Sequence, residues 1–587
     1  MPPSALDTST RDRRWPLPLP IAAGFAALLA GSLYLNALQN PFVHDDYRSI
    51  VENTSILNVR DLPGIAYQAM TRPLVNLSYA MDAAIWGRQP FGFHLTSVLL
   101  HMLNAGLVLY VAWFVAGDRR RQRGQLLPAT ASPIVVATAT AVLFAAHPLM
   151  TQAVGYISGR SEVLYTACFL AAFLSARRWM VRGGGRWWWA AMGLWALSLM
   201  AKETAAMLGV VLLLYDRLVL EGDAAERSRR LWRLHIPLLS MAALAGVIRL
   251  IVLIGVEYPG QQPADWRFAL VAVDVVRRYL LLLAFPRGQS IFHDVPVILE
   301  PLSGAAIAAV AGLAGFLTVA WWLRRVQSTV AFGCLWFVLM LVPSGVLFAL
   351  GRGEPMAEHR VYGASIGIFL AIGSAFGMLS HRLGGRGPGR RWLLHGLAAL
   401  FVVQLGGRTI VRNSVWGDPI RLSREAVELS PGHWLPRLLL GEALRTAGRC
   451  DQAIDEYRVA IDLRPQEAFA YTKLAGCLIG SGRLTEAAEA FAQLGAVDPE
   501  SPHASTGLGV VAILEDRVLE GRAHFSNALE KNPSDSLVRQ LLAFTDGTLD
   551  PERTAALCGE LARLAPATVP TEACAVSTGS GPRPPDR

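Results

Sequence analysis

The sequence predicts an all-α protein in which a polytopic membrane helical bundle is followed by an α-solenoid of short helical repeats. Hydrophobic residues make up 53% of the 587 residues and charged residues only 17%, whereas charged residues average about 25% in soluble proteins. The apolar residues are concentrated between residues 17 and 410, in runs long enough to cross a bilayer. Farther along the chain, prolines recur every 34 residues from Pro431 to Pro533, which is the period of a helix-pair repeat.

A membrane span needs about 20 mostly apolar residues, and we interpret eleven segments as spans. They lie near residues 17–37, 94–116, 131–147, 161–176, 187–201, 204–220, 236–256, 302–323, 329–349, 361–380 and 392–410. The first is interpreted as a retained anchor, because no small-residue cleavage site follows it. Segment 267–286 is also apolar, but Arg277 and Arg278 lie at its middle, and a charge at mid-bilayer costs a few kcal/mol. We therefore expect it to lie at the outer surface or to re-enter the membrane.

The net charge of +9 reports membrane topology and does not indicate a nucleic-acid partner. Arginines gather in the short segments between apolar runs, which is the positive-inside pattern. These clusters lie within 11–14, 119–123, 177–186, 227–233, 324–325 and 382–391. With the N-terminus inside, all of them are cytoplasmic, and segments 38–93, 148–160, 257–301 and 350–360 lie outside. Eleven crossings also place the C-terminal domain outside, which in a bacterial inner membrane is the periplasmic side.

The repeat segment has the period of the tetratricopeptide repeat (TPR). Three kinds of residue keep the 34-residue step, namely the prolines Pro431, Pro465, Pro499 and Pro533, the small residues Gly441, Ala475 and Gly509, and the aromatic residues Tyr457, Phe491 and Phe525. Small residues let the two helices of a pair approach, and the aromatic ring is expected to fill the gap between neighbouring pairs. Three repeats are predicted over 434–535, with a partial helix over 418–430. The concave face of such an array predicts protein or peptide binding, with a stabilising spacer as the alternative.

These patterns divide the chain into four parts. We predict a cytoplasmic segment over 1–16, a membrane domain over 17–415 with a large outer loop at 38–93, a TPR domain over 416–548, and a C-terminal helix with a disordered tail over 549–587. The six cysteines show no CxxC spacing, so neither a zinc site nor a redox site is predicted. A disulfide between Cys558 and Cys574 stays open if this part lies outside the cytoplasm.

Polar residues collect at the predicted outer face of the membrane domain. Asp45 and Asp46 stand side by side in the first outer loop, and further polar residues lie at Arg72, His147, Arg160, Glu162, Lys202, Glu203, Glu358, His359 and Arg360. Taken singly, the two aspartates are compatible with a solvated helix-capping pair. The other polar residues, taken singly, are compatible with ion pairs at helix ends. Taken together, they suggest a polar outer cavity. Carboxylates suit a general base, and arginine and lysine bind phosphate, so the set indicates a site that activates a hydroxyl while a phosphate leaves.

The chain resembles the transmembrane and TPR-containing O-mannosyltransferases and their bacterial relatives, members of the GT-C glycosyltransferase superfamily. The resemblance is carried, in order, by FVHDDYRSIVEN, RPLVNLSYAMDAAIWG, FHLTSVLLHMLNAGLV, AVLFAAHPLMTQAVGYISGRSEVLY, LSLMAKETAAMLGVVLLLYD and AEHRVYGASIGIF, followed by the TPRs. These stretches cover most of residues 40–370. The resemblance implies an integral-membrane glycosyltransferase. Such an enzyme takes a sugar from a polyprenyl-phosphate donor and passes it to an extracytoplasmic hydroxyl group, usually with inversion at the anomeric carbon.

The resemblance also implies roles for individual residues. Asp45 is the first choice for the catalytic base and Asp46 for its partner. Arg72, Arg160, Lys202 and Arg360 are candidates to bind the donor phosphate, with His147, Glu162, Glu203, Glu358 and His359 around them. Many members of the family have an arginine directly after the glutamate that corresponds to Glu358. Which of His359 and Arg360 corresponds to that arginine stays open. No cofactor is expected beyond the lipid-linked donor, and dependence on a divalent metal ion stays open, although an adjacent Asp–Asp pair alone makes a poor metal site. The donor sugar, mannose or another, and the acceptor, a protein or a glycan, also stay open.

Two other functions are compatible with the sequence. A transporter would show helices broken by glycine or proline, with charges at mid-membrane. A catalytically inactive membrane anchor would present the TPRs to partners. The deciding observation is whether the Asp45–Asp46 pair faces a cavity with the cations around it or lies on an open surface.

Overall fold

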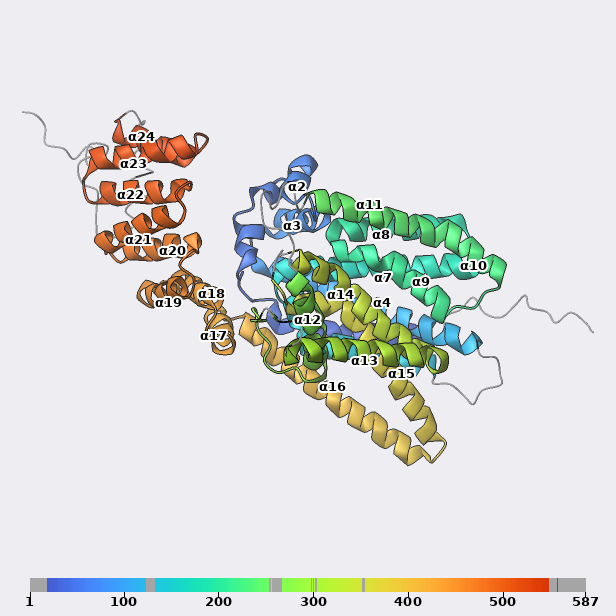
Figure 1. The fold of residues 1–587 in the computed structure, drawn as a ribbon. Coiled ribbons are helices and arrows are strands. Elements are labelled where there is room, and N and C mark those ends of the chain that lie inside the picture. Colours follow the sequence, from blue (N-terminus) through green and yellow to red (C-terminus); the bar gives the residue numbers. More distant parts are fainter. Residues whose placement is uncertain are drawn as a thin grey trace, which may run out of the picture. The chain divides into compact units, whose positions relative to one another are not determined.

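The computed structural model describes residues 18–122, 132–252, 255, 266–296, 298, 300, 303–350, 354–547 and 557. In these residues the regular elements are helices (Figure 1), which confirms the predicted all-α fold class. The chain divides into two compact units, Met1–Asp418 and Pro419–Arg587. The predicted N-terminal segment 1–16 and the Cys558–Cys574 disulfide lie outside the described residues. So does the predicted C-terminal helix and tail at 549–587, apart from Leu557.

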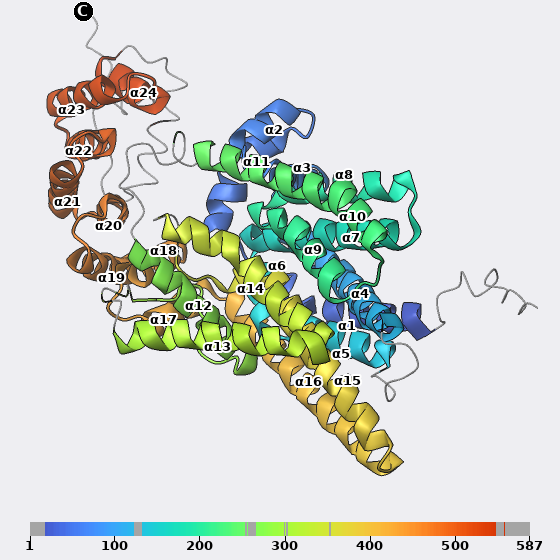
Figure 2. The same cartoon turned by 45° about the vertical axis from the view of Figure 1, so that its right-hand side comes forward.

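The first unit is a bundle of long apolar helices. They are α1 (Pro18–Ser32), α4 (Pro90–Gln122), α5 (Pro133–Ala146), α7 (Arg160–Arg182), α8 (Gly185–Ala201), α9 (Leu208–Leu218), α11 (Ile236–Val252), α12 (Trp266–Ala284), α13 (Gly304–Val326), α14 (Ser328–Ala349), α15 (Tyr362–Gly384) and α16 (Pro388–Trp416). Shorter helices include α2 (Leu62–Gln68), α3 (Pro73–Trp86), α6 (Thr151–Val154) and α10 (Ala224–Arg230). Figure 2 shows α15 and α16 side by side as an antiparallel pair joined at a tight turn.

Within the residues that the structure describes, eight helices of this unit are long and apolar enough to cross a membrane. A ninth span arises if α5 and the following Pro148–Val154 segment, bent by 57° at the His147–Pro148 break, count as one. Of the eleven predicted spans, α8 with 17 residues and α9 with 11 fall short on length, so the count of eleven stays a prediction. Helix α12, which covers the doubtful segment 267–286, is not among the helices that qualify.

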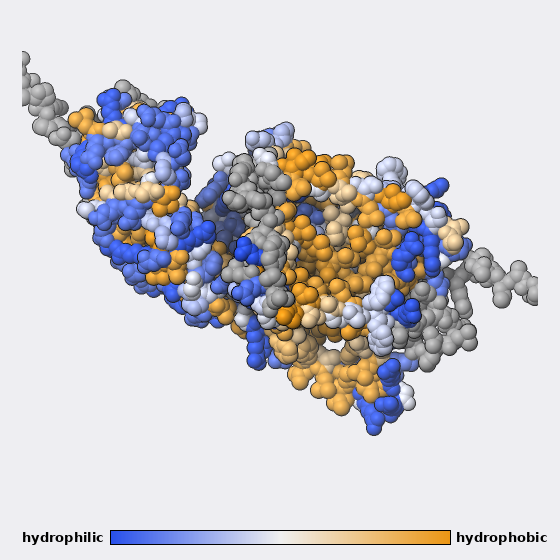
Figure 3. Space-filling model, viewed as in Figure 1, coloured by the Kyte–Doolittle hydropathy of each residue, from blue (hydrophilic) through white to orange (hydrophobic). Residues whose placement is uncertain are grey.

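The surface of the first unit is that of an integral membrane protein. Large apolar side chains lie exposed along α11, α13 and α16, among them Ile251, Trp322 and Val403. Figure 3 shows this apolar surface spread over the bundle, whereas the second unit is mostly hydrophilic. Soluble monomers rarely expose large apolar patches, which mark contact with lipid or a partner.

Small residues allow the helices of the bundle to approach closely. Gly333 of α14 and Gly367 of α15 face each other, and a methyl group on either would strike the backbone carbonyl of the other. Close contact at small residues is how helices pack in a membrane, where the apolar side chains gain little from leaving lipid.

The predicted outer loop 38–93 is folded. It contains a π-helical turn (Tyr47–Val51), a 3₁₀ turn (Thr54–Leu57), α2 and α3. Buried Asn76 joins these pieces, because its amide donates to Ser55 Oγ at 3.0 Å and to the Ile65 carbonyl at 2.8 Å, and its oxygen accepts from Asn53 at 2.9 Å. The loop is therefore a fixed wall at one end of the bundle.

The second unit is a stack of helix pairs. It contains α17 (Pro419–Leu429), α18 (Trp434–Thr446), α19 (Cys450–Leu463), α20 (Ala468–Gly480), α21 (Leu484–Val497), α22 (Pro502–Leu514), α23 (Val518–Lys531) and α24 (Ser536–Thr545). The first helices of successive pairs begin 34 residues apart, as predicted. A methyl group on Gly441 would lie 2.6 Å from the Tyr457 ring, so the small residue does make room for the aromatic ring of its own pair.

The turn inside each helix pair needs a left-handed backbone. Gly448 and Gly482 adopt φ values of 74° and 73°, and the residues after them donate backbone hydrogen bonds to carbonyls of the preceding helix, which caps it. In the third pair the same position is Asp516, with φ of 62°. A residue with a Cβ pays a steric cost of about 1–2 kcal/mol in this conformation, although aspartate tolerates it better than most.

Exchanging glycine and aspartate at this turn position is expected to change the stability of the repeat unit, with the sign set by the direction of the exchange. Asp516→Gly should raise the free energy of unfolding of the repeat unit by about 0.5–1 kcal/mol, and Gly482→Asp should lower it by a similar amount. Resistance of the repeat unit to limited proteolysis, measured on the full-length protein in detergent, ranks the two variants against the parent. A loss of resistance in Asp516→Gly would contradict the prediction.

Candidate functional site

A polar cavity of about 680 Å³ lies in the first unit, between the folded outer loop and the ends of the bundle helices. Its charged lining consists of the cations Arg48, Arg72, Lys202, Arg249 and Arg360 and the carboxylates Asp45, Glu203 and Glu354. Cations therefore outnumber carboxylates by five to three among these residues. His359, Ser158, Ser161, Asn76 and Tyr79 contribute further polar groups. A cavity with this balance suits an anionic ligand.

The adjacent aspartates point in different directions. The Asp46 side chain is fully buried, its Oδ1 accepts hydrogen bonds from the backbone N–H and the hydroxyl of Ser158, both at 2.7 Å, and its Oδ2 accepts from Val43 N–H at 3.1 Å. The Asp45 side chain is 61% exposed and lines the cavity. His44 between Val43 and Asp45 has a left-handed φ of 48°. Asp46 thus fixes the turn, and the turn presents Asp45.

The same geometry sets the protonation of the pair. Burial raises the pKa of Asp46 to about 6, against the hydrogen bonds from Ser158 and Val43. Burial also acts to raise the pKa of Asp45, but the hydrogen bond from His44 at 3.0 Å and the charge of that ring lower the pKa below its usual value. The pKa of His44 is raised in return, because the Asp45 contact outweighs burial. Asp45 is therefore ionised at neutral pH, as a general base must be.

Three of the four predicted phosphate-binding residues line the cavity. Arg72 lies 3.4 Å from Glu203 and keeps 41% of its side chain exposed. Lys202 is held at 2.5 Å by Glu162, which is buried behind it. Arg360 donates to the Glu354 backbone carbonyl at 2.6 Å and lines the cavity with His359 beside it. The charges of Arg72 and Lys202 lower the pKa of Glu203 to about 2, although burial acts in the opposite direction.

The structure does not bring Arg160 or His147 to the cavity. Arg160 is fully buried, forms an ion pair with Asp82 at 2.5 Å, and donates to the Phe93 carbonyl at 2.6 Å. His147 is buried at the bend after α5, where its Nε2 lies 3.0 Å from the Leu283 carbonyl. Both side chains are buried and bound to other helices or their ends, so the geometry assigns them to holding helices together.

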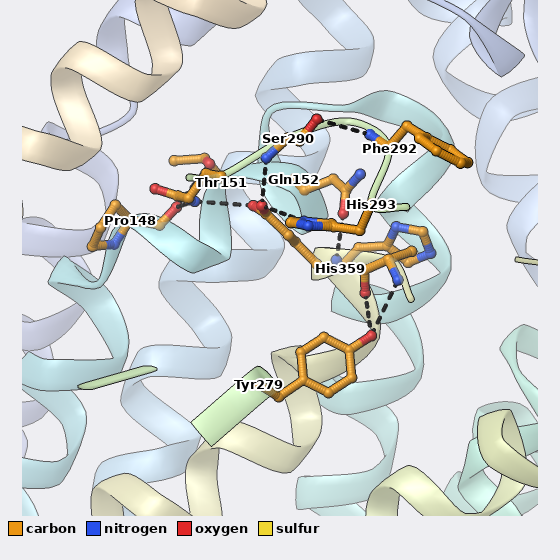
Figure 4. A network of polar contacts seen from close by, with 11 residues as sticks. Pro148, Thr151, Gln152, Tyr279, Ser290, Phe292, His293 and His359 are labelled. Atoms are coloured by element: carbon orange, nitrogen blue, oxygen red, sulfur yellow. Dashed lines mark hydrogen bonds and ion pairs between the residues drawn. The ribbon is translucent and has the colours of Figure 1, made fainter. Parts of the chain in front are cut away.

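Glu358 is not among the residues that line the cavity, and it belongs to a network of polar contacts with Ser290 and His293, two residues labelled in Figure 4. Its carboxylate accepts from Ser290 N–H at 2.7 Å and from Gln289 at 3.0 Å, and it lies 2.9 Å from His293 Nε2. The next backbone N–H, that of His359, donates to Gln152 at 2.6 Å. These bonds fix the 3₁₀ turn Glu358–Val361, on which Arg360 reaches the cavity.

A second, apolar pocket of about 250 Å³ adjoins the polar cavity. Side chains of α12, α13 and α14 line it, including Val276, Leu313 and Leu341. Ser344 and Arg360 line both spaces. A ligand that carries both an anionic group and a hydrocarbon chain would therefore find suitable surroundings for each on either side of Arg360.

Three residues of the cavity lining, Arg48, Arg249 and Glu354, were not predicted from the sequence. Arg249 had a clear signal, because it is a charge inside a predicted span, and such residues mark functional sites. Arg48 follows the aspartate pair by two residues, and Glu354 lies in a predicted outer segment. Among the described residues, no group of three or more histidine, cysteine or acidic side chains is placed to hold a metal ion.

Comparison with known proteins agrees with this architecture. The family model of the tetratricopeptide repeat matches residues 421–468 and 474–536. The chain is 26% identical to protein O-mannosyl-transferase Tmtc1 of Drosophila melanogaster, over 77% of this chain and 62% of that protein. It is also 26% identical to TMTC1 of Homo sapiens, over 77% of this chain and 56% of that protein. The chain resembles the TMTC protein O-mannosyl-transferases. This confirms the predicted resemblance.

The TMTC relatives are longer proteins, and the chain spans about six-tenths of their length. A shorter match, to Tmtc2 of Drosophila melanogaster, reaches 31% identity over 41% of this chain and 25% of that protein. Among solved structures, the TPR protein YrrB is 15% identical over 38% of this chain and 95% of its own, with a TM-score of 0.20.

The two aspartates are expected to differ in their effect on stability. Asp46→Ala leaves the buried N–H groups of Val43 and Ser158 without their acceptor, which costs about 1–3 kcal/mol. Asp45→Ala removes an exposed side chain and should change stability by less than about 0.5 kcal/mol. Thermal unfolding of the two purified variants in the same detergent measures the difference. Equal destabilisation by both changes would contradict the assignment of Asp46 as the anchor.

Proposed function

We propose that this protein is an integral-membrane glycosyltransferase that moves a sugar from a polyprenyl-phosphate donor to a hydroxyl group outside the cytoplasm. The observation that carries the proposal is the polar cavity in which ionised Asp45 and five cations face one space. An inactive scaffold has no need of an ionised base and a cluster of cations that face one cavity.

Asp45 acts on the acceptor. As the acceptor oxygen forms a bond to the anomeric carbon of the sugar, its proton passes to the Asp45 carboxylate. The bond between that carbon and the phosphate oxygen breaks, and the polyprenyl phosphate leaves with the electron pair. Attack from the face opposite the leaving group inverts the configuration. Asp46 holds the turn that presents Asp45 and does not contact the acceptor.

The cations act on the leaving phosphate. Negative charge grows on the phosphate oxygen as the sugar departs, and fixed positive groups stabilise that charge most strongly in an enclosed site. Arg360 is best placed, because it also lines the apolar pocket, where the polyprenyl chain would bind. Arg72 and Lys202 face the same space. The cavity supplies this positive charge from its own side chains, and we expect transfer to continue when a chelator removes divalent metal ions.

The relatives suggest the acceptor. They are named as protein O-mannosyl-transferases, which favours a serine or threonine hydroxyl of a protein and mannose as the sugar. An odd number of crossings, nine or eleven, with the N-terminus inside would place the TPR unit outside the cytoplasm, on the side of the Asp45 loop. The TPR unit would then bind part of the acceptor protein.

A lipid-glycan transporter is the second candidate. It is favoured by the 57° break between α5 and α6 and by the charge of Arg249 within a span, since broken helices and intramembrane charges are typical of transporters. A transporter would move the lipid-linked sugar without breaking its bond to phosphate, so the release of free polyprenyl phosphate distinguishes the two functions.

Asp45→Asn is expected to lower the turnover rate by about 10²–10⁴-fold, because the amide cannot accept the proton. The measurement is transfer from radiolabelled polyprenyl-phosphate mannose, with the glucose donor in parallel, to extracytoplasmic protein acceptors. Glu52→Gln, at an exposed carboxylate of the same loop, is the matched control and should keep its activity. Full activity in Asp45→Asn would exclude Asp45 as the base.

The pH dependence of transfer should report the His44–Asp45 contact. Because His44 lowers the pKa of Asp45, Asp45 stays ionised, and activity persists, down to a pH below the usual range of a carboxyl group. In His44→Asn, which keeps a residue tolerant of positive φ, the pKa of Asp45 should rise. The acid limb of the kcat/KM profile should then move to higher pH. An unmoved limb would show that His44 does not control Asp45.

A further inference from the structure

Two cysteines that are distant in sequence meet in the repeat unit. Cys450 is the first residue of α19, and Cys477 lies in α20, the first helix of the next pair. Their sulfur atoms are 2.7 Å apart, compared with about 2.05 Å in a disulfide bond. The two cysteines are 27 positions apart in the sequence, far more than in a CxxC motif, which explains why the sequence did not predict a redox pair.

We propose that Cys450 and Cys477 form a disulfide bond that joins two neighbouring repeats of the mature protein. The proposal rests on the extracytoplasmic placement of the repeat unit in the proposed function, because disulfides persist outside the cytoplasm. It does not depend on sugar transfer.

The surroundings favour a structural bond over a pair of working thiols. Cys477 is fully buried, whereas Cys450 is partly exposed. Burial is the main factor that raises the pKa of the Cys477 thiol, so this thiol is a poor nucleophile in the folded repeat. The partly exposed Cys450 is the sulfur that a folding catalyst reaches first, and the Cys477 sulfur that completes the reaction lies only 2.7 Å away.

The bond forms by thiol–disulfide exchange with a disulfide-carrying oxidoreductase. The Cys450 thiolate attacks the carrier disulfide and releases one carrier thiol. While the repeat is still folding and Cys477 is not yet buried, the Cys477 thiol loses its proton and attacks the mixed disulfide, which releases the second carrier thiol. The two cysteines lose two electrons and two protons in total, and the carrier disulfide is reduced to two thiols.

The position of the bond gives it a structural role. Each TPR contacts only its neighbours, so the stability of the array depends on the interfaces between adjacent pairs. A bond from α19 to α20 links one pair covalently to the next. It also closes a loop of about 28 residues in the unfolded chain, which restricts the unfolded state and so favours folding.

The sequence allows a direct test on the full-length protein purified from membranes. Arg449, Arg458, Lys473 and Arg483 flank the two cysteines, so trypsin releases peptides 450–458 and 474–483. Free thiols are blocked with N-ethylmaleimide during non-reducing denaturation, before digestion. The expected result is one linked species, two hydrogen masses below the sum of the two peptides, that separates on reduction. Two blocked, unlinked peptides would overturn the proposal, as would either cysteine linked to Cys558 or Cys574.

Matched variants exclude accidental pairing. Cys450→Ser should abolish the linked species, and Cys334→Ser, in the membrane span α14, should leave it intact. Cys477→Ser, at the buried partner, should also abolish the linked species. If the Cys477→Ser variant fails to fold, Cys450→Ser alone tests the disulfide. A reporter active only outside the cytoplasm, fused after the repeats, establishes their side separately. If Cys450 and Cys477 are free thiols, the disulfide proposal is wrong, whichever side of the membrane the repeat unit lies on. Sugar transfer measured on the same preparation tests the proposed function independently.

Discussion

A charged side chain inside a helical bundle costs several kcal/mol unless a partner replaces the water it has lost. In this protein that constraint acts most strongly on α7, which carries three buried charges. Arg160 pairs with Asp82 of α3, Glu162 with Lys202 after α8, and Arg177 with Asp118 of α4, each at 2.5 Å. Removing one member of such a pair leaves the other buried without compensation, which typically costs about 3–5 kcal/mol. Helix α7 is therefore fixed to three different elements.

The fixed position of α7 determines the geometry of the candidate site. Ser158, two residues before the helix begins, binds Asp46 and so sets the turn that presents Asp45. Glu162, in the first turn, holds Lys202 at the cavity. One end of one helix thus positions both the ionised carboxylate and one of the cations. Such preorganisation stabilises developing charge, since the groups need not reorient during the reaction.

The sequence predicted the repeats best and the roles of individual charges least. The 34-residue period is local, so it appears in the helix starts and in the Gly441–Tyr457 contact. Asp45 and Asp46 were found as a pair, but their roles differ because of hydrogen bonds to Ser158, more than 100 residues away. Arg160 was expected to bind phosphate. It is instead fully buried against Asp82, and only tertiary structure decides which cation finds a buried carboxylate.

Helix α12 shows how a charged segment can belong to an apolar bundle. Arg277 and Arg278, which argued against a span, both bind Asp274 one turn earlier, at 2.7 Å. The opposite face places Ala272, Val273 and Val276 along the apolar pocket. Tyr279 joins the two features, because its hydroxyl donates to the Ala357 carbonyl at 2.7 Å and accepts from the Ala357 N–H at 3.1 Å. Helix α12 therefore forms a wall of the apolar pocket and also fixes the backbone three residues before Arg360, the residue that links that pocket to the polar cavity.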